Sequence, residues 1–186
     1  MKASELPAED YGTAIARESV RITRLLPGPI ERVWSYLTQE DKRRQWMAAG
    51  AIELAPGGTV RHVFDNSRLT ERDDRPPPKY AGYAGEVTSV GHVIACEAPT
   101  LLSYSWNEES GTPSEVRFDL EPQGDKVLLT VTHSRISSRG AMMSFSAGWH
   151  THLDILRDRL EGREPPVFWP KHTRLEAEYE QRIPDF

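Results

Sequence analysis

The sequence predicts an α+β domain in which a curved antiparallel sheet holds one long C-terminal helix around an apolar-lined pocket. Two patterns support this class. Apolar and polar residues alternate in several consecutive stretches before about residue 134, which is typical of strands with one wet face. Apolar residues between 142 and 160 then recur at helical spacing over about five turns.

The first alternating stretch predicts a strand from Arg17 to Leu26, with Ile22 and Arg24 on one face. Pro27 to Pro29 breaks this strand. Residues 30–37 then carry apolar side chains at helical spacing, and a second short helix is predicted at 39–47.

The alternation resumes at residues 59–65, after a Pro-Gly-Gly turn. Residues 66–79 are charged and contain three consecutive prolines, which cannot occupy a central strand, so they predict a long and mobile hairpin loop. Tyr80 to Val90 is predicted to be a strand that ends in a turn at Gly91. Four further strands are then predicted at 92–96, 101–106, 115–121 and 127–133.

The long helix is predicted to place Trp149 on its apolar stripe, with Gly148 allowing a close approach to the sheet. Pro165-Pro166 prevents its continuation, and a tail follows with a polar helix from about Lys171 to Arg182. The tail is too apolar for a free extension. We expect its apolar residues to dock on the body of the domain or on a second subunit of a homodimer. These residues are Val167, Phe168, Trp169, Leu175 and Tyr179.

These patterns divide the chain into an N-terminal lead-in (1–16), one folded domain (17–162) and a C-terminal extension (163–186). The 186 residues suit a single domain. The net charge of −5, without a basic stripe, argues against nucleic acid as a partner. We expect no membrane span, and the single Cys96 permits no intramolecular disulfide, so the expected location is the cytoplasm.

Several segments resemble the helix-grip fold of the START-like (SRPBCC) superfamily. They include PIERVWSYLT at 29–38, GGTVRHVF at 57–64, YAGYAGEVTSV at 80–90, LLTVTHSRI at 128–136 and AGWHTHLDILRDRLEG at 147–162. Within this superfamily the chain is similar to the bacterial branch homologous to the C-terminal domain of the activator of the heat-shock-protein-ninety ATPase. The resemblance covers about residues 17–162 and implies a cavity between sheet and helix.

The aromatic content of the predicted inner faces suits a wall that holds a small ligand by burial. His62 and His133 fall on inward-facing positions, where an imidazole either satisfies a buried hydrogen bond or orients a ligand. The candidate ligand-binding residues are Trp34, Trp46, His62, Phe64, Tyr83, Tyr104, Trp106, Phe118, His133, Met142, Phe145 and Trp149.

The resulting hypothesis is a protein that binds a small hydrophobic or amphipathic molecule, with no cofactor, no metal and no assigned catalytic residue. Two alternatives stay open. One is an enzyme of the aromatase/cyclase or hydrolase type, with His133 and a pocket tyrosine as acid and base. The other is a chaperone-modulating interaction domain, which the name of the similar family suggests.

Overall fold

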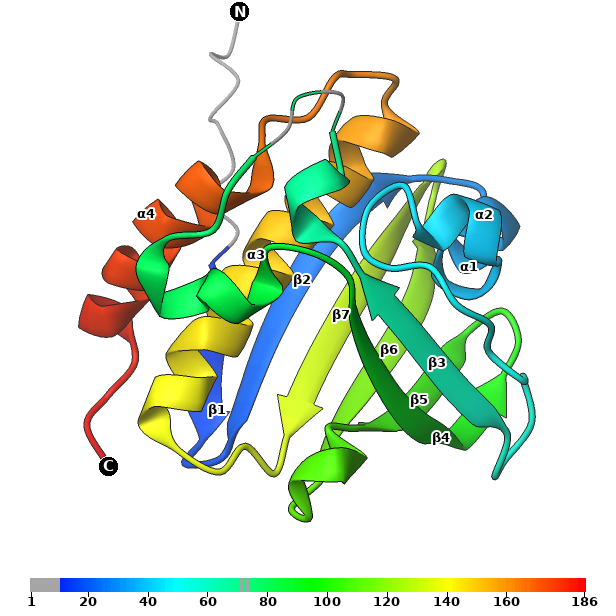
Figure 1. Ribbon diagram of the computed structural model, residues 1–186. Coiled ribbons are helices and arrows are strands. Elements are labelled where there is room, and N and C mark those ends of the chain that lie inside the picture. Colours follow the sequence, from blue (N-terminus) through cyan, green and yellow to red (C-terminus); the bar gives the residue numbers. More distant parts are fainter. Residues whose placement is uncertain (1–10, 71, 73) are drawn as a thin grey trace, which may run out of the picture.

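The computed structural model describes residues 11–70, 72 and 74–186, and Figure 1 shows a curved sheet with the long helix α3 lying across it. Seven antiparallel strands form the sheet in the order β1-β2-β7-β6-β5-β4-β3. The strands are β1 (Thr13–Ala16), β2 (Ser19–Pro27), β3 (Thr59–Phe64), β4 (Val87–Glu97), β5 (Leu101–Trp106), β6 (Ser114–Gln123) and β7 (Lys126–Ser134). The helices are α1 (Ile30–Thr38), α2 (Glu40–Arg43), α3 (Arg139–Leu160) and α4 (Phe168–Arg182). Short 3-10 turns are η1 (Asn66–Arg68), η2 (Pro78–Tyr83) and η3 (Glu108–Ser110).

This architecture confirms the predicted α+β class and the helix-grip arrangement. The alternation has the expected physical basis, because the inward positions of β6 and β7 are buried and their neighbours are more exposed. Phe118 pairs with Val131 across these strands, and Leu120 pairs with Leu129. Among the described residues, no helix combines the length and apolar character needed to span a membrane.

The prediction of a strand from Tyr80 to Val90 is wrong in its first half. Residues 78–83 form η2, and β4 begins only at Val87. The predicted turn at Gly91 is also wrong, because β4 continues through it to Glu97. A Cβ atom at Gly91 would overlap the backbone oxygen of Ser105 on β5, so glycine permits close strand packing here instead of a turn.

The described end of the lead-in is more ordered than a loose extension. Thr13–Ala16 forms edge strand β1, which pairs with β2. Just before it, the Gly12 N–H donates to the Tyr179 hydroxyl on α4 (2.7 Å). Residues 1–10 of the predicted lead-in lie outside the described part.

The loop after β3, which the sequence predicts to be long and mobile, contacts the rest of the fold at several points. Leu69 is buried, and its carbonyl accepts from Arg159 Nη2 on α3 (2.8 Å). The Asp74 carboxylate accepts from the Trp169 backbone N–H, and Ser67 Oγ accepts from Trp169 Nε1 (3.1 Å). The loop therefore joins the start of α4. Glu71 and Asp73 of this loop lie outside the described residues.

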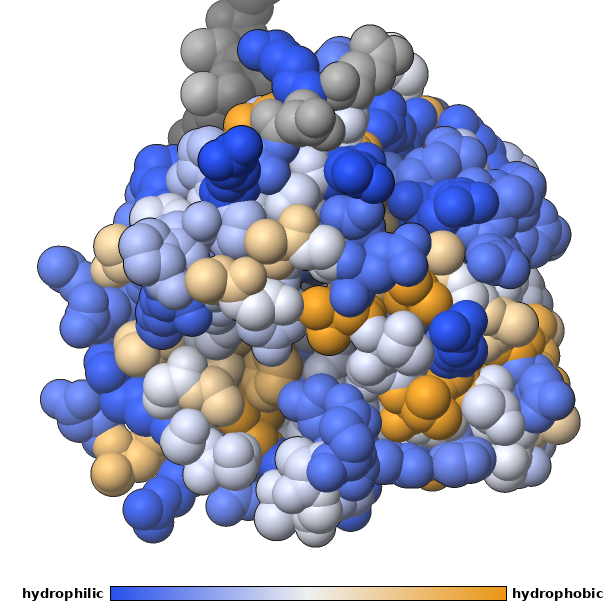
Figure 2. Space-filling view, viewed as in Figure 1, coloured by the Kyte–Doolittle hydropathy of each residue, from blue (hydrophilic) through white to orange (hydrophobic). Residues whose placement is uncertain are grey.

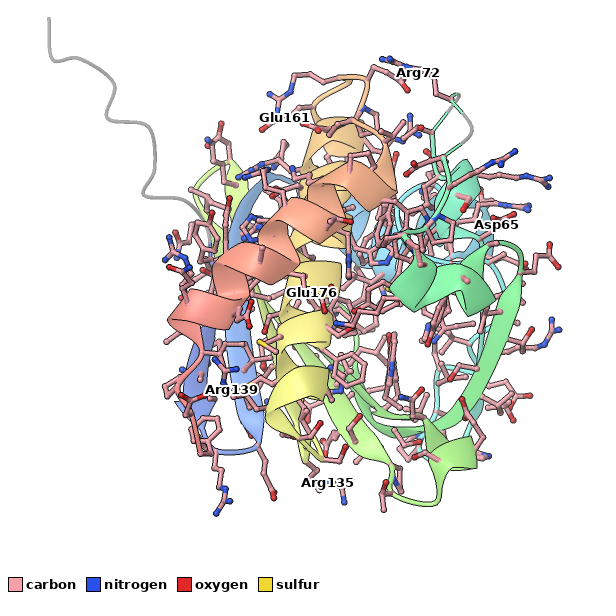
Figure 3. The ribbon with its side chains drawn as sticks, turned by 60° about the vertical axis from the view of Figure 1, so that its left-hand side comes forward. Asp65, Arg72, Arg135, Arg139, Glu161 and Glu176 are labelled. Atoms are coloured by element: carbon pink, nitrogen blue, oxygen red, sulfur yellow. The ribbon has the colours of Figure 1, made fainter. Side chains whose placement is uncertain are left out.

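Helix α3 is fully buried over residues 149–156, because the sheet covers one face and α4 lies across another (Figure 3). This arrangement confirms that the tail docks on the body: Phe168, Trp169, Leu175 and Tyr179 are each at most 3% exposed. Arg139, in the first turn of α3, donates to the carbonyls of Glu180, Ile183 and Pro184 at the end of α4. A cationic group at a helix C-terminus is favourable, so this contact fixes the far end of α4.

A buried carboxylate connects α3, β2 and α4. Asp154 Oδ1 accepts from Arg24 Nε on β2 (3.0 Å) and from Arg157 Nη2 (3.1 Å). Asp154 Oδ2 lies 2.7 Å from Lys171 Nζ on α4 and 3.4 Å from His150 Nε2. Burial alone would raise the pKa of Asp154, but the His150 hydrogen bond and the charges of Arg24 and Lys171 outweigh it and hold this pKa well below its ordinary value.

Replacing Asp154 with Asn should lower the free energy of unfolding by about 3–5 kcal/mol, because the mutation leaves the buried Arg24 guanidinium without this carboxylate. Asp119→Asn is the matched control. It breaks a pair between Arg117 and Asp119 that is largely exposed, and it should cost less than about 1 kcal/mol. Chemical denaturation of both variants would measure the difference, and equal losses would show that the Asp154 contacts are dispensable.

Candidate ligand-binding site

An aromatic pocket opens between the sheet, α3, η2 and α4. Its volume is about 120 Å³. Figure 2 shows apolar side chains gathering toward the middle of the face on which α3 and η2 lie, with charged side chains around them. The described residues that line the aromatic pocket are Met47, Phe64, Asn66, Tyr80, Tyr83, Trp106, Ser144, Phe145, Gly148, Trp149, His152, Phe168, Trp169 and His172.

Rings from five separate elements, β3, β5, α3, η2 and α4, form the walls of the pocket. On the sheet side, the ring centroids of Phe64 and Trp106 lie 5.7 Å apart, and Trp106 lies 5.5 Å from Trp149 on α3. On the opposite side, Tyr80 of η2 stacks on Trp169 at 5.5 Å. Phe168 lies 4.8 Å from His152. Such spacings are typical of favourable aromatic contacts, so the walls support one another without filling the space between them.

Gly148 contributes open space to the pocket, because it has no side chain. A Cβ atom built on Gly148 would meet no heavy atom within 4 Å. Our expectation that Gly148 allows close approach to the sheet is therefore wrong, since the glycine faces open space. A helix-interior glycine costs roughly 1 kcal/mol relative to alanine. Close packing does not offset this cost at Gly148. The missing side chain instead leaves room beside the aromatic rings.

His152 supplies a defined polar group in the pocket wall. Its Nδ1 lies 2.8 Å from the Trp46 carbonyl oxygen, which can only accept, so Nδ1 carries the hydrogen. Burial lowers the pKa of His152 to about 4, against the opposing effect of that hydrogen bond. The imidazole is therefore neutral at pH 7, and its Nε2 has a lone pair.

Polar contacts between η2 and α4 close one side of the pocket. The Tyr80 hydroxyl donates to Glu176 Oε1 (2.8 Å) and lies 2.9 Å from Ser144 Oγ on α3. Lys79 forms an ion pair with the same Glu176 oxygen. Figure 3 shows Glu176 on α4, which crosses in front of α3. These contacts hold the Tyr80 ring against Trp169.

Five of the twelve candidate residues line the aromatic pocket: Phe64, Tyr83, Trp106, Phe145 and Trp149. The other seven lie outside its lining. Trp34 is half-buried on α1, and Trp46, Tyr104 and Phe118 are core residues that are at most 2% exposed. Met142 belongs to a second apolar cluster beneath α4. His62 and His133 are also buried away from the pocket.

His133 supports the pocket wall from behind. Its Nδ1 accepts from Trp149 Nε1 (3.1 Å), so its Nε2 carries the hydrogen and donates to Ser114 Oγ (2.7 Å). Burial lowers the pKa of His133 to about 3. The chain of two hydrogen bonds fixes the Trp149 indole. The structure thus gives His133 a positioning contact with a pocket residue and no direct place in the lining.

His62 lies among the rings of Phe64, Tyr104 and Trp106, with centroid distances of 5.3 to 5.6 Å. Burial, followed by the charge of Arg43, lowers its pKa to about 3. Its Nε2 is buried without a hydrogen-bond partner among the described residues.

Sequence reasoning missed nine lining residues, and most come from the loop after β3 and from α4: Met47, Asn66, Tyr80, Ser144, Gly148, His152, Phe168, Trp169 and His172. The aromatic content of the tail was visible, but its position over the pocket depends on contacts between distant segments. Among the residues described, no three His, Cys, Asp or Glu side chains come together as a metal site.

The protein-family model described as Activator of Hsp90 ATPase homolog 1-like protein matches residues 27–161, which is more than half of the chain. A search of curated proteins finds no significant match.

Solved structures are similar over most of the chain. A protein encoded by gene BPP1335 of Bordetella parapertussis is 38% identical, with a TM-score of 0.76, and the match covers 98% of this chain and 97% of that one. CalU16 of Micromonospora echinospora is 22% identical, with a TM-score of 0.66, over 90% of this chain and 89% of its own. DynU16, a protein in the dynemicin biosynthetic locus, is 20% identical, with a TM-score of 0.63, over 81% of this chain and 49% of its own. The last two likenesses show the shared fold.

The buried histidines predict a loss of stability in acid. His62, His133 and His152 have folded-state pKa values of about 3, 3 and 4, below the ordinary value of 6.5. The unfolded chain takes up protons at these histidines below about pH 6.5, whereas the folded chain does not. The free energy of unfolding should therefore fall between pH 6.5 and 4, by up to about 1.4 kcal/mol per pH unit for each histidine.

Urea denaturation at a series of pH values would measure this slope. His62→Leu should reduce the slope by about one proton, because it removes one of the three buried imidazoles. A stability that is constant between pH 7 and 4 would contradict the neutral, buried state of these histidines.

Proposed function

The chain belongs to the family of Activator of Hsp90 ATPase homolog 1-like proteins, and from this premise we propose that it binds a small, mostly apolar molecule in the aromatic pocket. The open space at Gly148 carries the proposal. Folded interiors are close-packed, so a gap that is surrounded by eight Phe, Tyr and Trp side chains and bordered by a helical glycine favours a site for a ligand over a packing defect.

The size of the pocket favours a molecule, or part of one, with about one ring. An engineered apolar cavity of about 150 Å³ binds benzene, and the volume here is comparable. Tyr83 on η2 is 46% exposed at the mouth, so a longer ligand can extend past it into solvent. The position of DynU16 in a biosynthetic locus is consistent with small-molecule chemistry in a protein of this fold.

The enzyme alternative has one supporting observation, since His152 and His172 both line the pocket. A general acid or base also needs a reacting partner, and none of the described lining residues is a carboxylate or a cysteine. The chaperone-modulating alternative would need a contiguous apolar surface. Most of the exposed large apolar side chains, such as Ile15, Leu54 and Phe186, lie on separate segments, and only Val90 and Ile94 share a strand among the described residues. Binding therefore remains the best-supported proposal.

Gly148→Leu tests the proposal, because the new side chain has room to enter the pocket without a backbone clash. The variant should fold at least as well as the original chain, since leucine favours a helix by roughly 0.5–1 kcal/mol over glycine. It should lose a co-purifying or screened apolar ligand, as seen by native mass spectrometry of freshly purified protein.

Gly140→Leu is the matched control on the same helix. A Cβ atom at Gly140 also meets no heavy atom within 4 Å, but this residue does not line the pocket. Its ligand occupancy should be unchanged. If Gly148→Leu keeps full occupancy with an unchanged melting temperature, the aromatic pocket is not the binding site.

A further inference from the structure

Four hydrogen-bond donors in the lining of the aromatic pocket are committed to protein acceptors. Trp149 Nε1–H donates to His133, and Trp169 Nε1–H donates to Ser67. The Tyr80 hydroxyl donates to Glu176, and His152 Nδ1–H donates to the Trp46 carbonyl. These four donors are therefore not available to a ligand without breaking a contact that holds the wall together.

Some hydrogen-bond acceptors in the pocket lining, in contrast, have no donor from the protein. With Nδ1–H committed, His152 Nε2 keeps a lone pair in a residue that lines the pocket. Asn66 Oδ1, in another lining residue, is buried without a hydrogen-bond partner among the described residues. A buried acceptor without a donor costs roughly 1–3 kcal/mol, so a ligand that supplies a donor gains more than one that does not.

The lining also lacks formal charge. None of the described lining residues is Asp, Glu, Lys or Arg. Burial is the main cause that lowers the pKa of both His152 and His172, so these rings stay neutral at pH 7. An ionised ligand would leave water without a counter-charge in the wall, which is strongly unfavourable.

Building on the proposed binding function, we infer that the aromatic pocket selects an uncharged aromatic group that carries its own hydrogen-bond donor, with His152 Nε2 as the acceptor. A phenolic hydroxyl is the simplest group of this class. The ring fits among Phe64, Trp106, Trp149 and Phe168, and the donor meets His152, which lies between Phe64 and Phe168. His152 is thus the residue that determines specificity within an otherwise apolar wall.

Phenol and toluene provide a direct test, because they have nearly the same shape and only phenol has a donor. Each would be titrated into protein labelled with ¹⁵N at tryptophan, and the indole signals of Trp106, Trp149 and Trp169 followed. Trp34 lies outside the pocket lining and serves as the internal reference. Phenol should bind roughly 10-fold more tightly than toluene, and benzoate should bind more weakly than phenol.

His152→Asn keeps an N–H donor for the Trp46 carbonyl but removes the Nε2 acceptor. This variant should lose the preference for phenol over toluene, so that the ratio of the two affinities falls to about one. His150→Asn is the matched control, since it replaces a buried histidine two residues away on α3 that does not line the pocket. It should retain the preference.

The outcomes separate the two proposals. Toluene binding as tightly as phenol, with shifts at the three pocket tryptophans, would overturn the donor requirement and leave the binding function standing. Benzoate binding as tightly as phenol would overturn the selection for uncharged groups. An absence of shifts with all three compounds would instead contradict the proposed binding function itself. Because the phenol and toluene comparison uses the unmodified chain, it holds even if His152→Asn fails to fold.

Discussion

The Asp154 carboxylate is the contact on which the arrangement of helices depends. A charge inside a protein persists only when it is paired and hydrogen-bonded, and the partners of Asp154 come from β2, from α3 itself and from α4. Satisfying this one group therefore fixes where α3 crosses the sheet and where α4 lies on α3. His150 continues the connection, because its Nδ1 lies 2.9 Å from the Tyr179 hydroxyl, which in turn accepts from Gly12 at the start of the described chain.

The aromatic pocket follows from this arrangement. With α4 fixed over α3, the rings at its beginning face the rings of β3, β5 and α3 across a gap that Gly148 leaves open. The polar atoms of the walls are used chiefly to hold the rings in place, as in the chain from Ser114 through His133 to Trp149. The same contacts that rigidify the walls determine which hydrogen-bonding groups remain for a ligand.

The sequence was sufficient for most strands of the sheet and for α3, because alternation and helical spacing report directly on which face of an element is buried. Arg24 was placed on the inner face of β2, but its partner was not identifiable, since α3 lies about 130 residues later. Tyr80 to Tyr83 was misread as strand because its aromatic residues favour a sheet, whereas the prolines before it and contacts with Glu176 and Trp169 decide its conformation. The far wall of the pocket was missed for a similar reason. His152 and Phe168 meet only after α4 has folded back on α3.

Helix α4 lies beyond residues 27–161, the part that matches the family, and yet Phe168, Trp169 and His172 line the pocket. The strand pairings and the grip of the sheet on α3 do not pass through these three side chains. Substitutions at the beginning of α4 can therefore change which ligands the pocket binds while the strand pairings and the position of α3 stay the same. For protein engineering, substitutions at these three positions offer a route to new selectivities, provided that Lys171 and Tyr179 of α4 keep their contacts with Asp154 and His150.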